Sequence, residues 1–153
     1  MYHIDGNMKY EDWKKVFVDK SMSYKSWQDK QKNDIIKANI ASLAKENHIR
    51  FESVDYPPKK LEINISNFSF DDEHINKERE HNVTRKEAEM FIREAMFSLV
   101  RWKGRYICYF SSKGSTYVDI NDKKIRTSYH REQFDENTLI FIEGVENIGI
   151  KNN

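Results

Sequence analysis

Two histidines with the spacing of one helical face lie within DDEHINKEREHNVTRKEAE, which covers residues 71–89. Seven residues make almost two helical turns, so His74 and His81 are expected on the same side of a helix. Glu78 lies four residues after the first histidine and three before the second, and it shares that side. The pattern leaves three interpretations open: metal ligation, acid–base catalysis, and polar side chains on a solvated helix.

Metal ligation fits the spacing least well. Histidines seven positions apart on a helix are separated by roughly 10 Å along its axis, too far to share one ion easily. The H-E-x-x-H pattern of zinc proteases needs histidines four positions apart, and this chain lacks it. The single cysteine, Cys108, excludes a cysteine-rich zinc site and an intramolecular disulfide. We therefore expect no metal and no other cofactor.

Acid–base chemistry fits the histidines better, because basic residues follow them in the chain. Imidazole titrates near neutral pH, so it can exchange protons with a 2′-hydroxyl or a leaving oxygen without a metal. A cation must then stabilise the phosphoryl oxygens in the transition state. Residues 101–131 contain eight basic and two acidic side chains, a net charge of +6, although a solvated strand face also explains this charge. Arg126 with its neighbour Thr127 is the sharpest candidate. The candidates for further substrate contacts are Arg101, Arg105 and Lys124.

The composition describes one polar domain. Of the 153 residues, 33% are charged and 38% are hydrophobic, and the mean hydropathy is −0.87. That balance supports a single domain with a modest core. The sequence contains no signal-peptide pattern and no apolar run near 18 residues. We therefore expect a soluble protein without a membrane partner.

The first part of the chain is expected to be helical. The pattern M-x-Y-x-x-W occurs at 8–13 and again at 22–27, and each copy has the form of a short amphipathic helix start. These copies either pack onto their own domain or bind a partner through residues 1–28. Apolar residues at helical spacing predict a helix over 29–47. The prolines of DYPPKK (55–60) then interrupt regular structure and mark a boundary.

Two capping boxes follow this boundary. Ser69, with Asp72 three residues later, is a variant box that predicts a helix through the histidine stretch. Thr84 with Glu87 is the standard box and predicts a second helix over 85–97.

Strands are predicted on both sides of these helices. LEINI (61–65) alternates apolar and polar residues and predicts a short strand. LVRW, RYICYF, TYVDI and KIRTSY are separated by tight-turn signals and predict four antiparallel strands in a meander. The fold is therefore α+β, with helices packed on one face of the sheet. LIFIEGVENIGI, near the C-terminus, fits either a helix or a strand. The predicted organisation is an N-terminal helical segment (1–55), a domain with two helices on the four-stranded sheet (60–140) and a tail (141–153).

One geometric condition applies to Arg126 and Thr127. Successive residues of a strand face opposite sides of the sheet. The two side chains therefore enter one cleft only where a β-bulge or a strand end interrupts the alternation.

Several of these motifs together resemble a known family. HINKEREHNVTRKEAEMFIREA, TYVDI, KIRTSY and FDENT resemble the nuclease-like domain at the C-termini of phage minor head proteins. That domain is grouped with the barnase, EndoU, colicin and RelE (BECR) ribonuclease-like folds. MKYEDWKKVFVDKSMSYKSWQDKQ looks like the tail of such head proteins. The resemblance covers residues 8–40 and 68–138, and it departs from the family pattern at Ser128, where alanine is usual. A free-standing relative and a part of a larger head protein both remain open.

The resemblance implies a metal-independent ribonuclease site on a sheet with preceding helices. His74 and His81 match the two helix histidines of the family pattern. Arg126 and Thr127 match its Arg-Thr pair on the final strand, and Tyr117 lines the same cleft.

Two functions are expected candidates. The first is a phage-encoded, toxin-like ribonuclease, in which one histidine is the general base, the other is the general acid, Arg126 holds the phosphate and Thr127 donates a hydrogen bond. The second is a catalytically inactive phage binding module, either an inhibitor of a host protein or a structural domain of the virion. The expected partners are RNA or another nucleic acid, with phage head or host proteins contacted through residues 1–28. Both functions place the protein in the host bacterial cytoplasm or in the phage virion.

Overall fold

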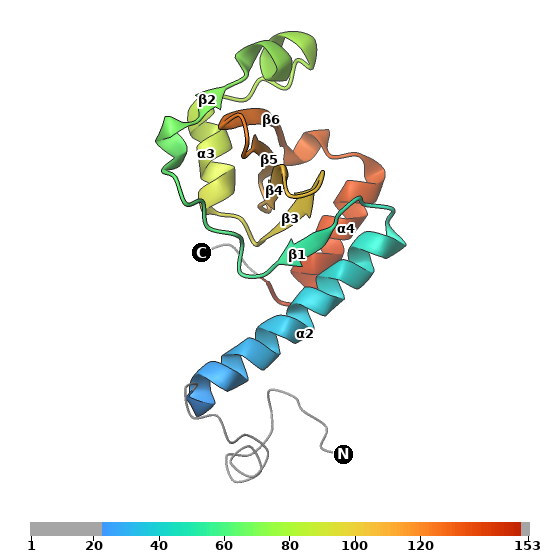
Figure 1. The fold of residues 1–153 in the computed structure, drawn as a ribbon. Helices are drawn as coiled ribbons and strands as arrows, with labels where there is room; N and C mark the ends of the chain where they lie inside the picture. The colour runs from blue at the N-terminus through green and yellow to red at the C-terminus, as the bar shows by residue number, and fades with distance from the viewer. Residues whose placement is uncertain (1–22, 151–153) are drawn as a thin grey trace.

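A six-stranded, mostly antiparallel sheet forms the centre of the protein (Figure 1). The computed structural model describes residues 23–150. Four consecutive strands are antiparallel neighbours: β3 (Phe97–Arg101), β4 (Tyr106–Phe110), β5 (Gly114–Asp119) and β6 (Lys124–His130). The short strands β1 (Ser53–Asp55) and β2 (Ser69–Phe70) extend the sheet at its two edges, and β2 runs parallel to β6. The fold is α+β as expected, but the sheet has six strands instead of four.

Helices cover both faces of the sheet, and the prediction of a single covered face was wrong (Figure 1). On one face, which we call the α2–α4 face, α2 (Tyr24–Glu46) and α4 (Glu136–Asn147) pack against the strands. The opposite face, which we call the α3 face, is covered by α3 (Arg85–Arg93) and by the short helix η2 (Glu73–Glu78). The cause is visible in β4, where four consecutive residues are buried. A strand whose successive side chains are all buried needs cover on both sides.

The two core clusters show which elements share each face. On the α2–α4 face, Ile40 of α2 and Phe141 of α4 lie in one cluster with Phe97 and Phe110 of the strands. Val54 of β1 belongs to the same cluster, so the expected division between residues 55 and 60 does not divide the hydrophobic core. LIFIEGVENIGI, which fitted either a helix or a strand, lies mostly in the helix α4. The segment assigned to a tail therefore contributes buried side chains to the core.

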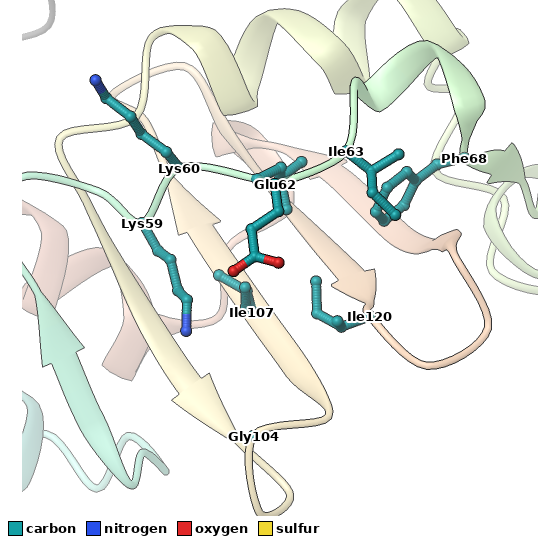
Figure 2. A pocket seen from close by; sticks show the side chains of 9 residues that line it. Lys59, Lys60, Glu62, Ile63, Phe68, Gly104, Ile107 and Ile120 are labelled. Carbon is teal, nitrogen blue, oxygen red and sulfur yellow. The ribbon is translucent and has the colours of Figure 1, made fainter.

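The strand expected at LEINI (61–65) does not form. Just before this segment, the backbone of Lys59 is bonded to side chains that project from the sheet. Its N–H donates to Ser98 Oγ at 2.9 Å, and its carbonyl accepts from Tyr109 Oη at 2.8 Å. Figure 2 shows the segment from Lys59 to Ile63 crossing in front of the strands instead of joining their edge. Leu61 and Ile65 of this segment pack against the core of the α3 face, whereas Ile63 between them is exposed.

The helix expected through the histidine stretch is a single π-helical turn, η2. Ser69 belongs to β2 and does not cap it. The N-cap residue is Asp72, whose side chain makes no capping bond, while Asp71 Oδ1 accepts from His74 N–H at 3.2 Å. The standard capping box of Thr84 and Glu87 is present, and α3 ends at Arg93 instead of reaching Phe97, which begins β3.

The N-terminal half supports the expected long helix. The sequence predicted a helix over 29–47, and α2 runs from Tyr24 to Glu46. The helix therefore begins earlier than predicted and ends one residue sooner. The first M-x-Y-x-x-W copy (8–13) lies outside the described residues, whereas Tyr24 and Trp27 of the second copy lie in the first turn of α2. Between residues 23 and 150, no helix is both long and apolar enough to cross a membrane.

Candidate active site

A β-bulge in β6 satisfies the geometric condition on Arg126 and Thr127. Tyr117 of β5 is opposite Thr127, whereas the next residue, Val118, is opposite Ile125. Arg126 is therefore the extra residue of the bulge. A bulge interrupts the alternation of side chains, so two successive residues can face the same side. Thr127 shares the side of Tyr117, its partner in the register.

Arg126 lines a small hollow on the α2–α4 face. The hollow has a volume of about 120 Å³. Its walls come from four strands and one turn: Arg101, Trp102, Tyr106, Cys108, Tyr117 and Arg126. Two arginines from β3 and β6 thus reach one space, although 24 residues of sequence lie between them. Such a pair of cations suits an anionic group.

Two tyrosines connect this hollow to His81. The Tyr117 hydroxyl lies 3.0 Å from the Tyr129 hydroxyl and 3.4 Å from Arg101 Nη1. The His81 and Tyr129 rings are 5.6 Å apart between centres. Burial, followed by the neighbouring Tyr129, raises the pKa of Tyr117 well above its usual value. The Tyr117 phenol is therefore neutral and able to donate a hydrogen bond at physiological pH.

His81 is held by the loop that follows η2. Its N–H donates to Ile75 O at 2.9 Å, and its carbonyl accepts from Gln133 Nε2 at 3.1 Å. The residues on either side, Glu80 and Asn82, have φ values of 57° and 55°, so the chain reverses sharply around the histidine. The His81 side chain is therefore positioned by a loop and not by a helix. The expectation that both histidines share one helical face was wrong.

The environment of His81 favours the neutral imidazole. Partial burial lowers its pKa, and the positive charges of Arg79, His74 and His130 lower it further. A histidine with a lowered pKa is deprotonated near pH 7, as a general base must be.

Asp71 connects His74 to Arg126. Its Oδ2 accepts a short hydrogen bond from Arg126 Nη1, and its Oδ1 accepts from the His74 N–H. The His74 ring has its own partner, because Nδ1 lies 3.2 Å from Glu78 Oε2. The contact leaves Nε2 as the ring nitrogen available to a substrate. Asp71 thereby fixes the strand arginine and the start of the histidine turn with a single carboxylate.

Arg105 and Lys124 are placed differently from the other candidates. Arg105 donates two hydrogen bonds to Asp119 Oδ2, at 3.0 and 2.9 Å, and one to Asp122 Oδ2 at 3.1 Å. Its guanidinium is thus engaged by two carboxylates beside the β5–β6 turn. Lys124 is opposite Asp119 in the sheet register. Neither residue lines the hollow, whereas the candidates Arg101, Tyr117 and Arg126 do. Thr127 lies on the Tyr117 side of β6. The histidines do not line the hollow: Tyr129 connects it to His81, and Asp71 connects Arg126 to His74.

Two residues that connect this site were not among the predicted catalytic and substrate-binding residues. Tyr129 follows Thr127 at a spacing of two, which places both on one side of β6, and that spacing was an available signal. Asp71 stands directly before the histidine turn, but its bond to Arg126 joins residues 55 positions apart. No local pattern encodes such a contact. Within residues 23–150, no group of three or more His, Cys, Asp or Glu side chains is arranged to hold a metal ion.

A second hollow lies on the α3 face (Figure 2). Its volume is about 190 Å³, and Ile107 and Ile120 belong to its lining. Figure 2 shows the Glu62 carboxylate projecting over these isoleucines, with Lys59 beside it. None of the residues that line this hollow is a histidine. It therefore offers an apolar surface with a few charges, without the proton-transfer groups of the first site.

No family model, curated protein or solved structure matches this chain. Function must therefore be inferred from the geometry of these residues.

Proposed function

We propose that this protein is a metal-independent ribonuclease whose active site contains His81, His74, Arg126 and Arg101. The observation that carries the proposal is a hollow lined by two arginines that Tyr117 and Tyr129 connect to His81, a histidine with a lowered pKa. A neutral imidazole can accept a proton, and arginines can hold a phosphate group. The likeness of the motifs to the phage nuclease-like group agrees with this chemistry, and membership of that group is part of the proposal.

The proposed reaction is an internal transfer at phosphorus. His81 removes the proton of a ribose 2′-hydroxyl, and the 2′-oxygen attacks the adjacent phosphorus. Arg126 and Arg101 stabilise the negative charge that builds on the phosphoryl oxygens, with further hydrogen bonds from the hydroxyls of Thr127 and Tyr117. His74 donates a proton to the leaving 5′-oxygen. The products are a 2′,3′-cyclic phosphate and a 5′-hydroxyl.

The test is cleavage of a labelled RNA oligonucleotide in the presence of EDTA. His81→Asn and His74→Asn each remove a proton-transfer group and should lower kcat by about 10²- to 10⁴-fold. His48→Asn is the matched control, because His48 is exposed at the end of α2 and lies outside the site. Full activity of His81→Asn, or a strict requirement for a metal ion, would contradict the proposal.

Substrates distinguish the proposed mechanism from other hydrolysis. An oligonucleotide that carries a single ribose among deoxyriboses should be cut only after that ribose, because the 2′-hydroxyl is the nucleophile. An all-deoxy strand should remain intact. Cleavage of the all-deoxy strand at a similar rate would exclude the internal-transfer mechanism.

A catalytically inactive binding module is the second candidate. Trp102, which lines the hollow, is 65% exposed, as a surface for nucleic-acid stacking would require. Equal RNA affinity of the wild type and the double variant His74→Asn/His81→Asn, without cleavage by either, would favour this function. The proposed partner is then a host protein or another protein of the virion, contacted through residues 1–28.

A further inference from the structure

A wider groove continues from the proposed active site. Its volume is about 620 Å³. The residues that line it are Lys45, Ile49, Arg50, Phe51, Glu52, Arg101 and Trp102. Arg101 and Trp102 line both this groove and the small hollow that contains Arg126. The two spaces therefore adjoin across one arginine and one tryptophan.

Trp102 is presented to solvent by a constrained turn. It is 65% exposed, and its φ of 57° lies in the left-handed region, which is unfavourable for a bulky residue. Glu52 holds the turn, because its carboxylate accepts from Lys103 N–H at 2.7 Å and from Gly104 N–H at 3.1 Å. Tyr106 packs edge-on against the indole, with ring centres 6.1 Å apart. An exposed indole in a strained conformation that other residues enforce points to a functional use.

The charges along the groove suit phosphate groups. Lys45 and Arg50 are exposed at one end, and Arg101 and Arg126 lie toward the hollow. Glu52 is the acidic residue of the groove lining, and both of its oxygens accept backbone N–H groups. A line of cations beside an exposed aromatic ring is the arrangement that binds single-stranded nucleic acid, through phosphate contacts and base stacking. In a duplex the bases are already stacked on one another and cannot use Trp102.

We propose that this groove binds the single-stranded part of an RNA substrate next to the cleaved phosphate. One base stacks on Trp102, and the neighbouring phosphates contact Arg50 and Lys45. The position of the cleaved bond rests on the proposed function, but binding in the groove is measured without cleavage. The inference thus names the substrate class as single-stranded RNA and assigns a subsite outside the catalytic residues.

The experiment measures binding of a fluorescently labelled octauridylate by anisotropy, with the full chain carrying His81→Asn. Adding Trp102→Ala should raise Kd about tenfold or more, the range expected for loss of one stacking contact. Trp102→Phe should retain most of the affinity, since a phenyl ring still stacks. Arg50→Ala should weaken binding and lower the slope of log K against log salt by about one phosphate contact. Lys32→Ala is the matched control, because Lys32 is an exposed cation elsewhere on α2.

The outcomes separate this inference from the proposed function. Octauridylate binding that depends on Trp102, with no cleavage by the wild type, supports the groove and contradicts the ribonuclease. Cleavage by the wild type, with Trp102→Ala binding octauridylate as tightly as its parent, overturns the groove and leaves the ribonuclease intact. Duplex RNA that binds as tightly as octauridylate also overturns the inference, as does equal loss of affinity in the Lys32→Ala control.

Discussion

Replacing Asp71 with asparagine tests whether the carboxylate positions the catalytic groups. Asp71 accepts from Arg126 Nη1 with one oxygen and from the His74 N–H with the other. The asparagine side chain has nearly the same shape but only one oxygen, so it can serve one of these donors. It also removes the negative charge that attracts the Arg126 guanidinium. Arg126 should therefore lose its fixed orientation while the fold persists.

The structure sets different magnitudes for stability and for activity. The Arg126 side chain is 45% exposed, so its ion pair with Asp71 is partly screened by solvent. Pairs of this kind contribute about 0–1 kcal/mol, so Tm should fall by no more than about 4 °C. Misplacing a phosphate-binding group by about 1 Å can lower catalysis by about 100-fold. We expect kcat/KM of Asp71→Asn to fall by about 10- to 100-fold.

The assay combines thermal unfolding with RNA cleavage and includes Arg126→Gln alone and together with Asp71→Asn. If Asp71 acts through Arg126, the double variant should be no worse than Arg126→Gln, because the two effects are not additive. Asp34→Asn is the control, since Asp34 forms an exposed ion pair with Lys30 at 3.0 Å on α2. The reasoning is refuted if Asp71→Asn cleaves RNA at the wild-type rate while Arg126→Gln is inactive.

Two further predictions concern pH and packing. The low-pH limb of kcat/KM should have its midpoint below about 6.5, the usual pKa of histidine, because burial and the neighbouring cations lower the pKa of His81. The unfolded chain then takes up a proton before the folded protein does, so the free energy of unfolding should decrease as pH falls below about 6.5. Urea unfolding at several pH values should show a smaller decrease for His81→Asn, and an equal decrease would contradict the lowered pKa. Gly114→Ala should lose about 1–3 kcal/mol in urea unfolding, because an added Cβ would lie 2.5 Å from the Phe91 ring and 2.6 Å from Tyr129 O. An unchanged unfolding midpoint would show that β5 and α3 can separate at no cost.

Local signals were sufficient for much of the secondary structure. The Thr84–Glu87 box depends on residues within one helical turn, and it starts α3 where the sequence predicts. The four central strands likewise follow from β-rich runs separated by tight turns. The strand predicted at LEINI (61–65) does not form, because a strand also needs the edge of another strand to pair with. An alternating pattern of apolar residues is equally compatible with a segment that packs across a sheet.

The candidate site was predictable in its residue types and less so in its assembly. The sequence identified His81 and Arg126, because imidazole and guanidinium have few equivalents for proton transfer and phosphate binding. It assigned Arg105 to the substrate, although two carboxylates engage that side chain. Arg126 is also paired with a carboxylate, so the two arginines differ in position: Arg126 lines the hollow and Arg105 does not. Charge counts cannot separate the two cases.

The sequence by itself determined the α+β class, the chemistry that the histidines and arginines can perform, and the condition under which Arg126 and Thr127 share a cleft. Tertiary structure alone decided that a β-bulge meets this condition and that Asp71 joins β6 to the histidine turn. It also decided that a loop, instead of a helical face, places His81 beside Tyr129. The physical reason is range: helix caps and strand alternation are set by neighbours within a few residues. A bulge and an ion pair across 55 positions are set by how the whole sheet pairs and packs.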